Sequence, residues 1–472
     1  MKTPNLDKWL FKYLIGNEEK IVFENAETQI KLKDLRELIS GFCDFLLSKK
    51  IKENDRVAIC AANSIEFAAM LFAIWETGAV PVLLNTRLLK EELIYQAEFS
   101  DCKIIISDRF TEKPFVPFPK IKKTVVPESE PGKFFPTKDA VIIFTSGSRN
   151  QPKAVVHSFR NMINSFKNTN SAVKFEPGDT FLVSLPFYHI GGLMIIIRAF
   201  LSGGKLAFPQ SLKTDELIEG ILKFRPNFIS LVPAQMISVI NKIKKTYSGL
   251  KMIFLGGGPS TPANLEMFIA SNFPIAKVYG SSETCSMITL LQPDELKKHP
   301  LSSGKVLPGS EIKFTADGEF VVKSDALFKG YLGKSKRRSK SKNFFTGDYG
   351  YEDDEGFIYI QTRREDLIVT GGENVNPEEI AEILQSFYEI DEVFVFAEND
   401  EKWGQIICAA VSVKNKKADF EENIFKHLRS NLPDYKIPKK IYLFSKLPIN
   451  EMGKLLLNDS EKRKALNIFN KL

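Results

Sequence analysis

The chain lacks a long uninterrupted apolar stretch. None of its apolar runs reaches the roughly 18 residues without charge that a membrane-spanning helix needs, so we expect no transmembrane segment. The first 20 residues carry scattered charges and show no apolar run followed by a small-residue cleavage site. This pattern argues against a secretory signal.

Cysteine and histidine are also scarce. The cysteines lie far apart, are odd in number and form no C-x-x-C pair, which argues against a disulfide framework and against a zinc site. They are Cys43, Cys60, Cys102, Cys285 and Cys408. The 4 histidines argue against a multi-histidine metal centre. The composition predicts a cytoplasmic protein, because thiols stay reduced in that compartment.

No concentrated charge of one sign marks a binding surface. The net charge is +7, but the basic residues are spread along the chain, whereas nucleic-acid binding favours a basic stripe with interleaved aromatics. We therefore expect no nucleic-acid partner. The densest basic run, at 333–342, is interpreted as a solvated loop or as a loop that contacts an anion. The oligomeric state stays open, with a homodimer as one alternative.

The chain has abundant apolar bulk in an alternating pattern. Its 472 residues are 43% hydrophobic and include 38 Phe, which predicts more than one domain with a large core. From 20 to 360, short strand-like runs alternate with longer amphipathic runs, which predicts α/β layers with largely parallel strands. The clearest predicted elements are strands at 56–62, 79–85 and 103–108, and helices at 64–78 and 90–99. Residues 115–136 contain five prolines and are predicted to form a loop.

The last part of the chain has a different pattern. Asn376 and Pro377 suit the cap and the first position of a helix. Strand-like runs follow at 392–398, 406–414 and 439–445, with a second helix predicted at 419–432. We therefore predict two domains. One is a large, multi-layer α/β domain at 1–364 with mainly parallel sheets, and the other is a small, mobile α+β domain at 365–472.

The most informative segment is residues 141–158. An apolar strand leads into Thr145-Ser146-Gly147-Ser148, and Lys153 follows after further polar residues. Hydroxyls and a glycine directly after a buried strand predict a loop whose backbone N–H groups face an anion. Lys153 would add a compact positive charge. Taken alone, such a loop is more often an ordinary surface turn.

Other motifs follow in order along the chain. They are Gly256-Gly257-Gly258, Tyr279-Gly280-Ser281-Ser282-Glu283-Thr284, Thr346-Gly347-Asp348, Arg363 with Glu365, Gly371-Gly372 and Gly453-Lys454. Each motif is weak by itself. The ordered set resembles the adenylate-forming superfamily of acyl-CoA synthetases, luciferases and peptide-synthetase adenylation domains, and the resemblance covers essentially the whole chain.

The resemblance implies a two-step reaction. A carboxylate attacks the α-phosphorus of ATP and releases pyrophosphate, and the thiol of coenzyme A then displaces AMP from the acyl-adenylate. The large domain would be an AMP-binding domain, in which the Thr145–Lys153 loop holds the β- and γ-phosphates and Glu283 helps to bind Mg²⁺. Magnesium prefers hard oxygen ligands, so a carboxylate beside phosphate oxygens suits it.

The same resemblance implies roles for the remaining nucleotide-binding motifs. Tyr279 would stack on adenine, and Gly256-Gly257-Gly258 would allow close approach because glycine lacks a Cβ atom. Asp348 would bind the ribose hydroxyls, and Arg363 would lie beside the ribose and phosphates. The other members of the predicted nucleotide site are Gly280, Ser281 and Ser282.

Lys454 resembles the lysine that bridges the attacking carboxylate and the α-phosphate. Related enzymes rotate the small domain about a hinge residue that matches Glu365. Lys454 would then serve the first step, and Gly371-Gly372 would face the active site in the second.

The phosphate loop departs from the family pattern, with Arg149 in place of a hydroxyl residue and Asn150 in place of glycine. The strength of ATP binding therefore stays open, and a non-catalytic nucleotide-binding relative is one alternative.

Several segments point to the acid. Those at 182–194, 252–262, 278–290 and 301–309 resemble most the o-succinylbenzoate–CoA ligase family of menaquinone biosynthesis. In that family the position of His189 lines the acyl pocket, so we predict His189 as a third catalytic residue beside Lys454 and Glu283. A core histidine is the other interpretation. We expect conversion of o-succinylbenzoate to its CoA thioester. The alternative is an aryl- or medium-chain acyl-CoA synthetase with the same mechanism.

Overall fold

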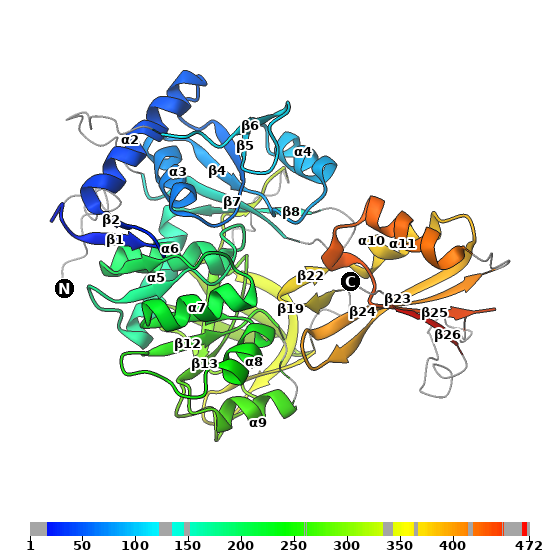
Figure 1. Ribbon diagram of the computed structural model, residues 1–472. Helices are drawn as coiled ribbons and strands as arrows, with labels where there is room; N and C mark the ends of the chain where they lie inside the picture. Colours follow the sequence, from blue (N-terminus) through cyan, green and yellow to red (C-terminus); the bar gives the residue numbers. More distant parts are fainter. Residues whose placement is uncertain are drawn as a thin grey trace.

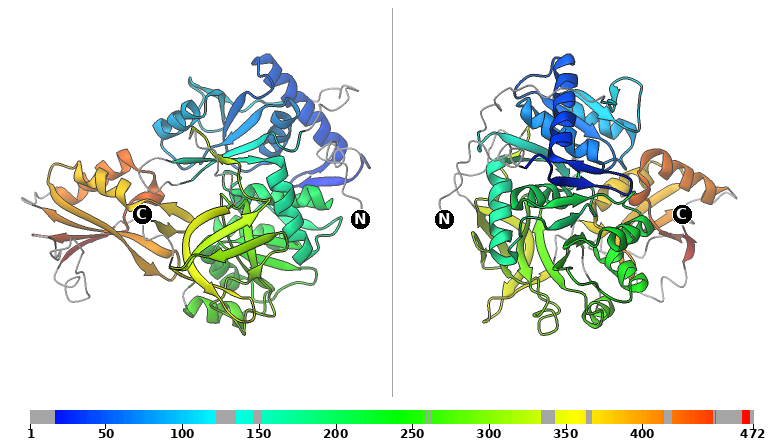
Figure 2. Two further views of the ribbon diagram at one scale, coloured as in Figure 1. Left: turned by 180° about the vertical axis from the view of Figure 1, so that it is seen from behind. Right: turned by 60° about the vertical axis from the view of Figure 1, so that its left-hand side comes forward.

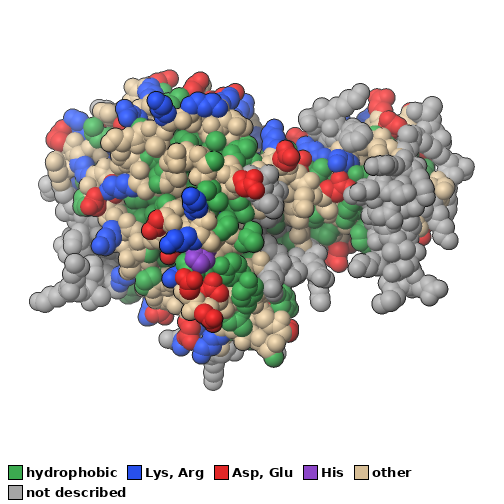
Figure 3. Space-filling model, turned by 90° about the horizontal axis from the view of Figure 1, so that it is seen from below, with side chains coloured by type: hydrophobic (Ala, Val, Ile, Leu, Met, Phe, Trp, Pro, Cys, Tyr) green, Lys and Arg blue, Asp and Glu red, His purple; other side chains and the backbone are tan. Residues whose placement is uncertain are grey.

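The protein consists of a large N-terminal body and a smaller C-terminal body (Figures 1 and 2). Seen from below, the C-terminal body projects from one side of the broad N-terminal one (Figure 3). The computed structural model describes residues 17–121, 135–145, 152–258, 260, 262–333, 343–362, 367–413, 419–445, 447 and 465–469. Within these residues, no helix is both long enough and apolar enough to cross a membrane.

The largest sheet of the N-terminal body has nine strands. In spatial order they are β15 (Lys305–Val306), β14 (Ser286–Leu291), β13 (Ile275–Ser281), β12 (Met252–Leu255), β11 (Phe228–Leu231), β9 (Thr180–Leu182), β10 (Lys205–Ala207), β1 (Ile21–Glu24) and β2 (Gln29–Lys31). All pairings from β13 to β1 are parallel, and β2, β14 and β15 pair antiparallel. The carboxyl ends of the parallel strands therefore meet at one edge, where binding sites of open α/β sheets usually lie.

The second sheet has seven strands. In spatial order they are β18 (Gly330–Tyr331), β8 (Lys153–Ser158), β7 (Asp139–Thr145), β4 (Val80–Leu83), β3 (Arg56–Cys60), β5 (Cys102–Ser107) and β6 (Phe115–Pro117). The pairings from β7 to β6 are parallel, whereas β8 pairs antiparallel with both β7 and β18. In the β7–β8 hairpin, Thr145 lies opposite Lys153. The register thus places both ends of the predicted phosphate loop side by side.

A third, four-stranded sheet is antiparallel throughout. Its strands are β16 (Ser310–Phe314), β17 (Glu319–Ser324), β19 (Asn343–Glu352) and β20 (Ile358–Thr362). It carries the Thr346-Gly347-Asp348 motif on β19. Sequence periodicity does not predict this sheet, because its strands are only partly buried.

Two helices of the N-terminal body are buried almost all round. In α3 (Ile65–Glu76) and α6 (Ile190–Ser202), nearly every side chain belongs to one core cluster. A helix that is apolar on every side must lie inside the protein rather than on its surface. The other helices of this body are α2 (Leu32–Ser48), α4 (Lys90–Phe99), α5 (Phe159–Val173), α7 (Thr214–Phe224), α8 (Pro233–Lys242) and α9 (Pro262–Ala270).

The C-terminal body is a six-stranded mixed sheet with helices beside it. Its strands are β22 (Glu373–Val375), β21 (Ile368–Thr370), β23 (Ile390–Asp400), β24 (Gly404–Val413), β25 (Lys440–Phe444) and β26 (Leu466–Phe469). Its helices are α10 (Pro377–Gln385), α11 (Phe420–Asn431) and the short 3-10 helix η2 (Asp434–Lys436). The Asn376 side chain accepts the N–H of Glu378 at 3.0 Å, so the predicted cap of α10 is confirmed.

The predicted fold class is confirmed. The strands and helices predicted from the sequence all occur, with ends shifted by a few residues. One expectation is wrong: the segment at 115–136 begins with β6 and is not loop throughout, because Phe115 is buried beside Ile105. The predicted boundary between residues 364 and 365 lies outside the described residues, as does nearly all of the basic run at 333–342. The division into 1–364 and 365–472 therefore stays a prediction.

Candidate active site

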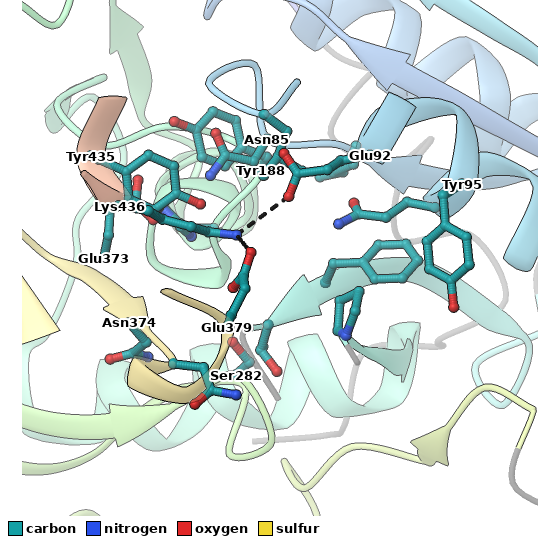
Figure 4. A pocket seen from close by; sticks show the side chains of 18 of the residues that line it. Asn85, Glu92, Tyr95, Tyr188, Ser282, Glu373, Asn374, Glu379, Tyr435 and Lys436 are labelled. Carbon is teal, nitrogen blue, oxygen red and sulfur yellow. Dashed lines mark hydrogen bonds and ion pairs between the residues drawn. The ribbon is translucent and has the colours of Figure 1, made fainter. Parts of the chain in front are cut away.

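A cavity of about 470 Å³ lies between the two bodies (Figure 4). The N-terminal body lines it with α4, the ends of β4 and β7, and the residues before α6. The C-terminal body lines it with Gly372 to Asn376, α10 and the end of η2. Four residues predicted from distant parts of the sequence meet here, namely Thr145, His189, Ser282 and Gly372.

Glycines of the C-terminal body pack against the triple glycine of the N-terminal body. Gly371 and Gly372 have φ of 57° and 86°, a backbone conformation that residues other than glycine rarely adopt. A Cβ atom added to Gly372 would lie 2.9 Å from Val232 Cγ1 and 3.9 Å from the carbonyl oxygen of Gly257. One added to Gly258 would lie 3.8 Å from Val369 Cγ1. The structure therefore brings Gly371-Gly372 to the site, in an arrangement that leaves no room for a side chain at Gly372.

His189 faces a carboxylate of the C-terminal body. It is the cap residue of α6, and its Nε2 lies 3.2 Å from Oε2 of Glu373. Glu373 is buried and also pairs with Arg87 at 3.5 Å. Burial acts to raise the pKa of the Glu373 carboxyl, but His189 and Arg87 hold that pKa below its usual value. In the sequence Glu373 appears only as the residue after the Gly371-Gly372 motif, with no role predicted for it, and Arg87 was missed altogether.

Glu283 and Lys153 meet at the β18 edge of the seven-stranded sheet. The hydroxyl of Tyr331 donates to Oε1 of Glu283 at 2.7 Å, and Lys153 Nζ lies 5.6 Å from the centre of the Tyr331 ring. A carboxylate and a lysine at one place match the needs of Mg²⁺ and phosphate. Ser281 adds a buried hydroxyl oxygen that has no hydrogen-bond partner among the described residues. These features fit a magnesium–nucleotide complex. Ser146, Gly147 and Ser148 lie outside the described residues.

Tyr279 and Asp348 form a direct contact. The Tyr279 hydroxyl donates to Asp348 Oδ2 at 2.6 Å, and the Tyr279 side chain is only 4% exposed. The tyrosine therefore orients the carboxylate predicted to bind ribose, and its contact with adenine stays a prediction. Next to it, a Cβ at Gly280 would lie 2.0 Å from the carbonyl oxygen of Ser286, so only glycine fits. Arg363, Glu365 and Lys454 lie outside the described residues.

His157 is a further residue for which the sequence predicted no role. It is completely buried on β8, and its Nε2 lies 2.7 Å from the carbonyl oxygen of Ser282. Burial lowers the pKa of His157 to about 4, so its ring is neutral near pH 7 and donates through Nε2. Through this hydrogen bond, the imidazole holds the backbone at Ser282, the residue before Glu283.

The buried His157 should make the N-terminal body sensitive to acid. Unfolding exposes the ring, which then binds a proton below pH 6.5, whereas the folded ring stays neutral until about pH 4. Stability is therefore lost as the pH falls through this window, by about 3 kcal/mol at its lower end. Urea unfolding of the wild type and of His157→Gln should show a shallower loss in the variant between pH 7 and pH 5. Equal losses in both proteins would contradict this assignment.

Arg198 is another residue for which the sequence predicted no role. It lies in the apolar helix α6 and is 2% exposed. Its Nη2 donates to Ser286 Oγ at 3.1 Å, and its guanidinium lies 5.8 Å from the ring of Phe254. Among the residues that the structure describes, its Nε has no hydrogen-bond partner. Within the described residues, no carboxylate pairs with it. Burial lowers the pKa of Arg198 to about 10, which still leaves it charged. A buried cation without an anion is costly. Arg198 lines a small cavity of about 10 Å³ beside Phe228 and Phe254, apart from the cavity between the bodies.

Two family matches cover most of the chain. The family described as AMP-binding enzyme matches residues 16–332, and the family described as AMP-binding enzyme C-terminal domain matches residues 379–454. The chain belongs to the AMP-binding enzyme family.

Within this family, the chain is similar over its whole length to 2-succinylbenzoate–CoA ligases. It is 31% identical to that of Bacillus cytotoxicus, over 96% of this chain and 97% of the relative. It is 29% identical to that of Listeria innocua, over 97% of this chain and 99% of the relative.

Among solved structures, the chain resembles o-succinylbenzoate CoA synthetase of Bacillus subtilis. A double mutant of that enzyme, bound with its product analogue OSB-NCoA, has a TM-score of 0.88 at 28% identity and covers 95% of this chain and 97% of its own. The complex with the acyl-adenylate intermediate OSB-AMP has a TM-score of 0.73 at 27% identity and covers 96% of this chain and 98% of its own. The two structures have nearly the same sequence identity to this chain and nearly the same coverage. The difference between their TM-scores therefore reflects a different arrangement of the N-terminal and C-terminal bodies. The arrangement in this protein is closer to that of the product-analogue complex.

Proposed function

We propose that this protein is an ATP-dependent acid–thiol ligase that converts o-succinylbenzoate to its CoA thioester, as a step of menaquinone biosynthesis. The reaction runs through an acyl-adenylate and releases pyrophosphate and AMP. ATP with Mg²⁺ and coenzyme A are the co-substrates. The full-length similarity to 2-succinylbenzoate–CoA ligases supports this proposal.

The choice of acid rests on the burial of the positively charged Arg198 side chain. o-Succinylbenzoate has two carboxylates. One attacks ATP, and the other needs a partner once it leaves water. Arg198 is a fully buried cation for which the described residues offer no anion. An acid with a single carboxylate would leave this charge unpaired, so the site favours a dicarboxylate.

In the first step, the protein gathers cations where negative charge concentrates. Two anions approach each other as the carboxylate attacks the α-phosphorus, and the pyrophosphate leaves with additional charge. We assign Lys153 to the leaving phosphates and Lys454 to the attacking carboxylate and α-phosphate. Glu283, oriented by Tyr331, would hold Mg²⁺, which neutralises the phosphate charge when it is bound.

In the second step, the C-terminal body shapes the route of the thiol. We assign the cavity between the two bodies as this route, because residues of both bodies line it together with Thr145, His189 and Ser282. Gly372 lines this cavity, and its lack of a side chain allows the C-terminal body to pack closely against Val232. The five free cysteines fit a reducing cytoplasm, where the reaction would take place. A homodimer remains a prediction.

A screen of pyrophosphate release tests the proposal. The purified chain is given ATP, Mg²⁺ and one acid at a time, with and without coenzyme A. o-Succinylbenzoate should give the highest rate, and a CoA thioester should form only when coenzyme A is present. Equal rates with benzoate or medium-chain acids would favour a broader acyl-CoA synthetase. A lack of pyrophosphate release with every acid would favour a non-catalytic relative.

A further inference from the structure

A buried lysine lies between two glutamates on the wall of the cavity between the bodies. Lys436 Nζ is 2.6 Å from Oε1 of Glu379 and 3.3 Å from Oε1 of Glu92 (Figure 4). The Lys436 side chain is only 8% exposed, and the two glutamates are each about 30% exposed. The sequence predicted helices that include Glu92 and Glu379 but no contact among these three residues.

The cluster joins the two bodies. Lys436, at the end of η2, and Glu379, on α10, belong to the C-terminal body, whereas Glu92 lies in the first turn of α4 in the N-terminal body. Beside the cluster, the guanidinium of Arg87 lies 4.6 Å from the centre of the Tyr435 ring. This contact also crosses from one body to the other.

The two ion pairs of Lys436 respond differently to movement of the C-terminal body. The Lys436–Glu379 pair moves as one unit with that body and survives any rotation. The Lys436–Glu92 pair exists only in an arrangement that seats η2 against α4. Because Lys436 is almost fully removed from water, its charge interacts strongly with a second nearby carboxylate. The Glu92 contact therefore stabilises one arrangement selectively.

We propose that Glu92 is a docking residue that receives Lys436 and holds the C-terminal body in place for thioester formation. Glu92 and Lys436 are thus positioning residues for the second half-reaction. The proposal rests on the proposed function, since it needs two half-reactions. The arrangement is the one that also brings Gly371-Gly372 to the site and that matches the product-analogue complex with a TM-score of 0.88. Adenylation, which needs Lys454 at the site, gains nothing from this contact.

The test compares Glu92→Gln with the wild type in each half-reaction. The amide keeps the size of the side chain and an oxygen that can still accept the N–H of Leu89, which Glu92 accepts at 2.9 Å. We expect thioester formation from supplied o-succinylbenzoyl-adenylate and coenzyme A to slow by roughly five- to tenfold, since one charge partner of a buried lysine is lost while the other remains. Pyrophosphate release in the first half-reaction should be unchanged or faster.

Glu98→Gln is the matched control. It removes the same charge from the same helix, and within the described residues Glu98 makes no ion pair. This variant should match the wild type in both half-reactions. If Glu92→Gln behaves like Glu98→Gln, or slows both half-reactions equally, the docking role is wrong.

A double-mutant cycle separates docking from support of the C-terminal fold. Lys436→Gln also loses the contact with Glu379. This single variant therefore cannot separate docking on Glu92 from support of the C-terminal fold. If the two residues dock with each other, adding Glu92→Gln to Lys436→Gln should cost nothing further in thioester formation. If the double variant instead slows thioester formation by the product of the two single effects, the proposal is wrong. Failure of the proposed function is a different result, because the wild type would then form no o-succinylbenzoyl-adenylate at all.

Discussion

Replacing Lys454 with alanine should reduce pyrophosphate release by roughly a hundred- to a thousandfold, the cost of losing one preorganised charge at a reacting centre. The reason is electrostatic. The attacking carboxylate and the α-phosphate are both anions, and the resemblance to adenylate-forming enzymes assigns Lys454 to the bridge between them. Thioester formation from supplied acyl-adenylate should stay within about twofold, because the C-terminal body then presents Gly371-Gly372 to the site instead.

Lys426→Ala is the control for this experiment. Lys426 is exposed on α11 of the same body, so its loss removes one positive charge far from the reaction. Stopped-flow assays measure the rates of adenylation and of thioester formation separately in each variant. Equal losses in both half-reactions would show that Lys454 supports the structure rather than the first chemical step.

Replacing Arg198 with methionine should lower kcat/KM for o-succinylbenzoate by roughly a hundredfold or more, because the second carboxylate of the substrate then enters an apolar site without a partner. Methionine has a similar length and suits the apolar helix α6. The effect should depend on the acid. Adenylation of a benzoate that lacks the second carboxylate should stay the same or improve.

The same variant should be more stable than the wild type when no ligand is present. Arg198 is fully buried and, within the described residues, has no anionic partner, so its removal relieves a desolvation cost of roughly 1–4 kcal/mol. Thermal unfolding with and without o-succinylbenzoate measures this. The acid should raise the midpoint of the wild type but not of Arg198→Met. Arg198→Lys keeps a charge and should recover part of the activity. A destabilised Arg198→Met with equal losses for both acids would mean that Arg198 is a structural residue.

Local features of the sequence predicted much of the fold. Helix α10 begins where Asn376 and Pro377 predict it, because the cap hydrogen bond is made by neighbours in the chain. The strand that ends at Thr145 also occurs where the buried apolar run predicts it, whereas its antiparallel pairing with the strand that begins at Lys153 was not predicted. Apolar runs located α3 and the central strands, since burial of apolar surface dominates their placement.

Other features had no local signal. His157 and Arg198 could have been noticed only as polar residues within apolar runs, and their roles depend on the segments packed against them, such as the Ser282 carbonyl and Ser286 Oγ. The antiparallel third sheet was missed for a related reason, because its strands are only partly buried and show no strong period.

Residue types, caps and periodicity were therefore enough to predict a large α/β body and a small α+β body, because those properties act over a few residues of chain. The adenylating site was indicated by the resemblance of the ordered motifs to a known superfamily. The contacts between the bodies arose only on folding. Glu373 meets Arg87 across 286 positions and Lys436 meets Glu92 across 344. Such pairs depend on how two packed bodies seat against each other, and charges that are distant along the chain interact only when folding brings them within a few ångströms and removes the water between them.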